Sequence, residues 1–129
     1  MLVLDTNILI EIERGNNKVI NTLSEIRKEH KESVAITSPV YAEFLYGFIR
    51  KGKEIIAKQY IENLDVFDFD SKSAEVLAKL KHEIEDKGAT IPIFDLLTAS
   101  IVISKKAILV TMDNHFKSVP KIDIILVQA

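Results

Sequence analysis

Short apolar runs alternate with longer amphipathic segments along this chain of 129 residues. The apolar runs predict strands at residues 2–4, 34–37, 66–67, 107–110 and 122–127. Apolar residues at helical spacing predict helices from near Ile8, over 16–30, 38–51 and 53–64, from Ser71 toward Gly88, and over 93–104. This alternation indicates a parallel, doubly wound sheet of about five strands in a three-layer α/β/α sandwich.

Capping residues sharpen the expected helix boundaries. Asn7, Ser38 and Ser71 are expected as N-caps, because their side chains accept hydrogen bonds from the free N–H groups of a first helical turn. Gly52 and Gly88 are expected just beyond helix C-termini, where the backbone often turns left-handed.

Composition limits the class of protein. The length and an apolar content of 47% suit one compact core, so we expect a single domain over residues 1–129. The absence of cysteine excludes disulfides and thiolate chemistry and favours the cytoplasm. No apolar run approaches the roughly 20 residues of a membrane span, so we expect a soluble protein. A net charge of −2 gives no global attraction to nucleic acid.

Four acidic residues fall where a parallel sheet binds ligands, beyond the carboxyl ends of its strands. Asp5 follows the first predicted strand directly, and Asp113 comes three residues after Val110. Glu43 lies near the start of the helix after the second strand, and Asp95 lies in the first turn of the helix at 93–104. Taken alone, each of them is better explained as a turn, capping or surface residue. Together they are expected to converge.

Such a cluster has a specific chemistry. Asp5 and Asp95 lie in apolar surroundings, where an uncompensated carboxylate is costly to bury. A cation offsets that cost, and carboxylates without cysteine or histidine favour Mg²⁺ or Mn²⁺ over zinc. Bound to the cluster, the ion would make it a site for phosphodiester hydrolysis.

Four segments, in order and correctly spaced over essentially the whole chain, resemble the PIN domain and, within it, the VapC-like toxins of toxin–antitoxin modules. They are LVLDTNILI, SPVYAEFLYG, IPIFDLLTAS and LVTMDNHF.

The resemblance implies a site and partners. Asp5, Glu43, Asp95 and Asp113 match the family's acidic metal-binding residues, and Asn7 and Thr111 match supporting polar positions. It also implies endonucleolytic cleavage of RNA dependent on Mg²⁺ or Mn²⁺, homodimers, and inhibition by a small cognate antitoxin.

Other residues bear on substrate and partners. His115 stands where the family often has another acid, and we interpret it as a surface or capping side chain outside the catalytic set. The helices within 40–64 carry more apolar side chains than a monomer needs, so an antitoxin helix or a second subunit is expected to pack there. The cations that could contact RNA are Arg14, Arg50, Lys51, Lys53, Lys105, Lys106 and Lys117.

Three alternatives remain. A haloacid-dehalogenase-like phosphatase needs an aspartate two residues after the first, where this chain has Asn7. A receiver-like signalling domain needs adjacent acids after its first strand, and residues 65–70 (DVFDFD) imitate its phosphoacceptor region only loosely. A catalytically inactive PIN-fold binding module would typically have lost some of the four carboxylates, and all are present here.

Overall fold

The computed structural model describes residues 1–128 as five strands and seven helical segments. Ala129, the end of the predicted domain, lies outside the described residues. In chain order the elements are β1 (Leu2–Leu4), α1 (Thr6–Glu13), α2 (Asn17–His30), β2 (Val34–Thr37), α3 (Ser38–Arg50), α4 (Glu54–Ile61), β3 (Asp65–Phe67), α5 (Ser71–Asp86), α6 (Ile93–Ser104), β4 (Ile108–Thr111), the 3₁₀ helix η1 (Asn114–Ser118) and β5 (Asp123–Leu126).

The strands form one fully parallel sheet in the order β3-β2-β1-β4-β5. From β1 the chain builds one side of the sheet through β2 and β3, then returns to place β4 on the other side of β1. The pair β1–β4 is therefore the topological switch point, beside which open α/β sheets bind ligands. The predicted parallel sheet of about five strands is confirmed.

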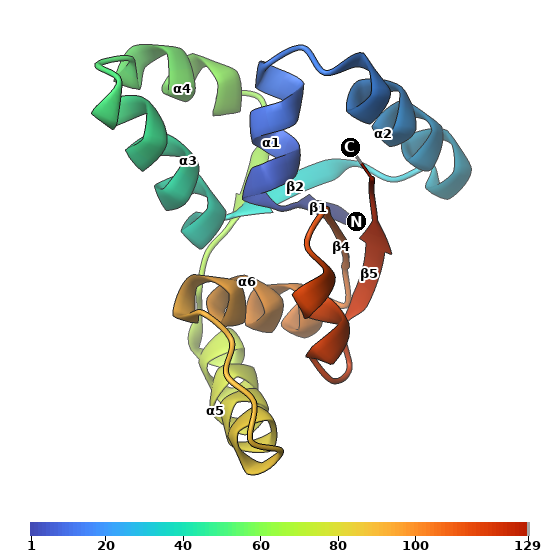
Figure 1. Cartoon of the computed structure of the whole chain (residues 1–129), viewed down its shortest axis with the longest axis vertical. Coiled ribbons are helices and arrows are strands. Elements are labelled where there is room, and N and C mark those ends of the chain that lie inside the picture. The colour runs from blue at the N-terminus through green and yellow to red at the C-terminus, as the bar shows by residue number, and fades with distance from the viewer. Residues whose placement is uncertain (129) are drawn as a thin grey trace.

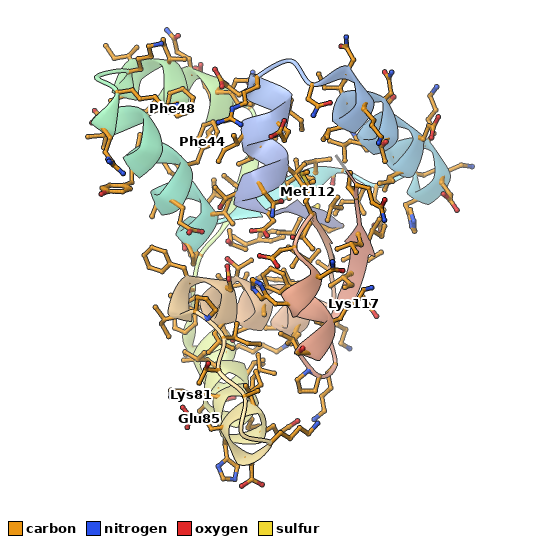
Figure 2. The ribbon with its side chains drawn as sticks, viewed as in Figure 1. Phe44, Phe48, Lys81, Glu85, Met112 and Lys117 are labelled. Atoms are coloured by element: carbon orange, nitrogen blue, oxygen red, sulfur yellow. The ribbon has the colours of Figure 1, made fainter. Side chains whose placement is uncertain are left out.

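Alternate residues of the strands separate two hydrophobic cores, because successive strand side chains point to opposite faces. Leu2 and Leu4 pack with α1, α2, α3 and α4, whereas Val3 packs with α5 and α6. Figure 1 shows this division, with α1 to α4 on one side of the sheet and α5 and α6 on the other. Phe44 and Phe48 of α3 pack in the first core with ring centroids 4.8 Å apart and an angle of 43° between the ring planes (Figure 2). The three-layer sandwich is confirmed.

The predicted N-caps are each wrong by one or two residues. Asp5 caps α1 in place of Asn7, Thr37 caps α3 in place of Ser38, and Asp70 caps α5 in place of Ser71. In each case the side chain of the earlier residue accepts a hydrogen bond from a free N–H of the first turn. Gly52 and Gly88 follow their helices at φ of 70° and 74°, as predicted.

Within residues 1–128, no helix combines the length and the apolar character needed to cross a membrane.

Candidate active site at the switch point of the sheet

Asp5 is the buried centre of the site. It directly follows β1 and caps α1, so its backbone position is fixed by both elements. Its side chain is held by the hydroxyl of Thr111 at 2.7 Å and the backbone N–H of Thr6 at 2.9 Å. Asp5 is only 6% exposed. Burial raises the pKa of Asp5 above its ordinary 3.8, and the two hydrogen bonds offset part of that rise.

The supporting residues predicted from the resemblance lie around Asp5 and connect the two strands of the switch point. The Thr111 hydroxyl, at the end of β4, also accepts a hydrogen bond from the backbone N–H of Asp113 at 3.1 Å. The amide oxygen of Asn7 accepts the N–H of Met112 at 3.2 Å. The Asn7 side chain is therefore engaged with the turn after β4, which explains why it does not cap α1.

Glu43 reaches the site from α3. Its Oε1 accepts a hydrogen bond from the Thr6 hydroxyl at 3.1 Å, which ties α3 to the first turn of α1. Partial burial is the main cause that raises the pKa of Glu43. The hydrogen bond from Thr6 lowers that pKa in part, and the charges of Asp95 and Asp5 raise it further. Glu43 therefore lies close enough to both aspartates to feel their charge.

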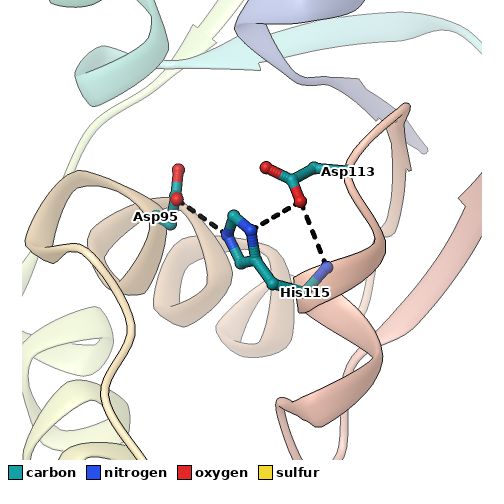
Figure 3. A group of neighbouring side chains, drawn as sticks. All are labelled: Asp95, Asp113 and His115. Carbon is teal, nitrogen blue, oxygen red and sulfur yellow. Dashed lines mark hydrogen bonds and ion pairs between the residues drawn. The ribbon is translucent and has the colours of Figure 1, made fainter.

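Asp95 and Asp113 form the more exposed part of the site together with His115 (Figure 3). Asp95 lies in the first turn of α6, and Asp113 caps η1. His115 lies between them, with Nε2 2.8 Å from Asp95 Oδ2 and Nδ1 2.5 Å from Asp113 Oδ1.

The pKa of Asp95 is raised by burial, and both His115 and Asp113 also affect it. The charge and hydrogen bond of His115 lower it, and the charge of Asp113 raises it. The charges of Asp95 and Asp113 also raise the pKa of Asp5, and those of Asp95 and Asp5 raise the pKa of Glu43. The fold thus brings together the four carboxylates that the sequence singled out.

His115 is the functional candidate that the sequence interpretation left out. It was expected as a surface or capping side chain, but its ring bridges two of the four predicted ligands. The contact with Asp95 joins residues 20 apart in the chain, so no local sequence pattern predicts it. Two indications are present in the sequence: its position two residues after Asp113, and its place where the family often has another acid.

The donor set suits a divalent cation. Asp5, Glu43 and Asp95 all have raised pKa values because burial and neighbouring charges disfavour their ionised forms. In the part of the chain that the structure describes, no lysine or arginine forms an ion pair with any of the four carboxylates. Asp95, Asp113 and His115 each offer a ligand atom within 4.8 Å of the others. A bound cation would relieve the repulsion that no protein side chain neutralises fully.

Comparison with known proteins gives a family. The PIN domain family matches residues 2–122. Ribonuclease VapC2 of Rickettsia felis is 34% identical over 127 residues, which cover 93% of this chain and 92% of that protein. Ribonuclease VapC3 of Methanocaldococcus jannaschii is 28% identical over 77% of this chain and 95% of its own length.

A solved structure agrees with these relatives. The crystal structure of VapBC2 from Rickettsia felis, bound to a DNA fragment from its promoter, contains a chain that is 30% identical and has a TM-score of 0.86. The match covers 98% of each chain. The chain therefore belongs to the PIN-domain family and, within it, to the VapC-like proteins.

Proposed function

We propose that this protein is a metal-dependent endoribonuclease that hydrolyses RNA phosphodiester bonds, and that it acts as the toxin of a VapBC-type toxin–antitoxin pair. The observation that carries the proposal is the convergence of Asp5, Glu43, Asp95 and Asp113 at the switch point of the sheet. The raised pKa values of Asp5, Glu43 and Asp95, and the lack of a neutralising lysine or arginine among residues 1–128, make this a site for a cation. We further propose that residues 1–129 form a single PIN domain.

In this proposal Asp5, Glu43, Asp95 and Asp113 hold Mg²⁺ or Mn²⁺. The bound ion supplies a Lewis acid that neutralises phosphate oxygens and lowers the pKa of a water molecule. Asp5 is positioned by Thr111 and by the N-terminus of α1, and Glu43 is oriented by the Thr6 hydroxyl. The protein therefore holds a preformed set of oxygen atoms that would bind the ion.

Cations near the site provide a path for the RNA backbone. Arg14 and Lys51, two of the cations considered from the sequence, line a small groove between α1 and α3 that also includes Glu43. Cationic side chains beside a metal site attract phosphates without selecting a base sequence. We assign this groove to the RNA segment that flanks the cleaved bond.

Cleavage of labelled total RNA tests the function. We expect discrete fragments from the wild-type protein with Mg²⁺ or Mn²⁺, no fragments with EDTA, and none from Asp5→Asn. The matched control is Asp86→Asn at the exposed end of α5, which should cleave like the wild type. Metal binding by the wild type without any cleavage would instead favour the catalytically inactive binding module.

The apolar surface of α3 and α4 is the proposed contact with a small cognate antitoxin. Tyr46 is 61% and Ile55 is 70% exposed, and Ile49, Ile56 and Tyr60 add to the same region. This is the region within 40–64 in which the sequence placed excess apolar side chains. Arg50 and Lys51 stand beside these residues, over the rings of Tyr46 and Phe48. An amphipathic helix with acidic flanks would match this surface.

Co-purification with the neighbouring gene product tests this contact. We expect Ile55→Glu to lose the partner, because a buried carboxylate opposes packing of an apolar helix. Ala78→Glu on the exposed side of α5 is the control and should retain it. Retention of the partner by Ile55→Glu would place the antitoxin elsewhere.

We propose a homodimer in the cytoplasm, and light scattering at several concentrations measures the oligomeric state.

A further inference from the structure

His115 connects two parts of the site that are distant in the chain. Its ring lies between Asp95 on α6 and Asp113 after β4 (Figure 3). Its backbone N–H also donates to Asp113 Oδ1 at 3.1 Å. His115 thus bridges the carboxylates of Asp95 and Asp113, which lie on different elements of the fold.

The contacts of His115 use one oxygen of each carboxylate. Asp95 is engaged through Oδ2, whereas Asp113 is engaged through Oδ1. Among residues 1–128, the remaining oxygens, Asp95 Oδ1 and Asp113 Oδ2, have no hydrogen-bond partner. Each carboxylate therefore keeps one oxygen available for a cation.

The orientation of the His115 ring is itself fixed by the fold. It stacks on Phe116, with ring centroids 4.8 Å apart and an angle of 26° between the ring planes. Phe116 is fully buried and packs in the core against α5 and α6. A ring held by a buried neighbour and by two carboxylates loses little further freedom when the site is occupied.

The ring itself is poorly placed to be a ligand. Both of its nitrogens lie at hydrogen-bond distance from a carboxylate oxygen, so binding a cation through either nitrogen would break one of these two contacts. Partners that hydrogen-bond to ligating carboxylates orient them and tune the affinity for the metal.

We infer that His115 is a positioning residue of the metal centre, which holds Asp95 and Asp113 so that each presents its free oxygen to the same cation. The inference rests on the proposed function, because it takes the four carboxylates as the metal site. It assigns to His115 a role in metal affinity that is separate from contact with RNA.

Binding of Mn²⁺ to the full chain, measured by calorimetry without RNA, tests the inference. We expect His115→Ala to weaken binding about 10- to 100-fold, the usual effect of removing a partner of metal ligands. His115→Gln retains an amide donor and should recover part of the loss. His82→Ala, on the exposed face of α5, is the matched control and should bind like the wild type. Circular dichroism verifies that each variant is folded.

Two results would overturn the inference. One is equal Mn²⁺ affinity in the wild type and in a folded His115→Ala variant. The other is a nitrogen coupling in the pulsed electron paramagnetic resonance spectrum of bound Mn²⁺ that disappears in His115→Ala, since this would make His115 a direct ligand. Both leave the proposed function intact. A wild-type protein that binds no Mn²⁺ or Mg²⁺ would overturn the proposed function itself.

Discussion

Asp5 and Asp113 follow neighbouring strands of one sheet, but their side chains lie in different surroundings. The closed half of the site, Asp5 with Asn7 and Thr111, is held by hydrogen bonds between the ends of β1 and β4. The open half, Asp95, Asp113 and His115, has side chains that are 21%, 42% and 35% exposed. A buried carboxylate fixed by several donors is rigid but costly to ionise, whereas the open half depends on one histidine for its geometry. The two halves should therefore respond differently to the same kind of substitution.

The largest expected effect is the loss of RNA cleavage in Asp5→Asn. Its amide removes a ligand at the buried centre and offers Thr111 or Thr6 an N–H in place of an acceptor. We expect cleavage to fall by at least about a thousandfold, since a bound metal supplies several kcal/mol to the transition state. Asp113→Asn should lose less, because its side chain is more exposed. Initial rates at saturating Mg²⁺ measure both; equal losses would contradict the distinction between the halves.

Thr111→Val separates positioning from ligation in the closed half. Valine removes the hydroxyl that donates to Asp5 and accepts from Asp113, but leaves all four carboxylates. We expect Mn²⁺ affinity to fall about 10- to 100-fold, and the free energy of unfolding to fall by about 1–3 kcal/mol because buried polar groups lose their partner. Calorimetry and urea denaturation measure these effects. The exposed Thr90→Val serves as the control, and unchanged Mn²⁺ affinity in Thr111→Val would count against the role of the hydroxyl.

The pH dependence of stability without metal follows from the raised pKa values. A carboxyl whose pKa is raised by folding binds its proton more tightly in the folded state, so its penalty is absent below the ordinary pKa and grows as pH rises. The free energy of unfolding should therefore decrease as pH increases above the ordinary values of 3.8 for Asp5 and Asp95 and 4.5 for Glu43. Thermal unfolding in EDTA measures it. Asp5→Asn and saturating Mg²⁺ should each flatten the slope, and an unchanged slope in both would refute this origin.

The smallest expected effect is for the hydrogen bond between Thr37 and Thr98, which joins two helices of the site. The hydroxyls of Thr37, the cap of α3, and Thr98 on α6 lie 3.0 Å apart and are buried. They join the helix that carries Glu43 to the helix that carries Asp95. We expect Thr98→Val to lower the free energy of unfolding by about 1 kcal/mol, the usual contribution of one hydrogen bond. Cleavage should change only a few-fold; a loss as large as that of Asp5→Asn would show that this pair does more than support the helices.

The comparison of the two halves also shows where sequence reasoning succeeds. Asp5 stands out because a carboxylate interrupts an apolar run at the end of a strand, and Thr111 ends another strand nearby. Asp95 and Glu43 are recognised by the resemblance and by their positions in early helical turns. The role of His115 was not accessible in this way, because it depends on a contact with Asp95 across 20 residues.

Helix caps show the same limit at smaller scale. Asn7, Ser38 and Ser71 are all good capping residues, yet each lies inside the helix because the preceding strand or loop ends one or two residues earlier than its polar pattern suggests. The side chain of Asn7 instead accepts a hydrogen bond from the backbone N–H of Met112, a contact that forms only in the folded sheet.

The sequence by itself determined the order of strands and helices and the parallel sheet, and it singled out four acidic residues as the candidate site. It could do so because apolar periodicity and the ends of strands are local properties of the chain. Tertiary structure alone decided how these residues meet: the return of the chain across β1 brings Asp5 beside Thr111, and the docking of α6 against the turn after β4 brings His115 between Asp95 and Asp113. Such contacts depend on the packing of elements distant in sequence, which no local pattern encodes.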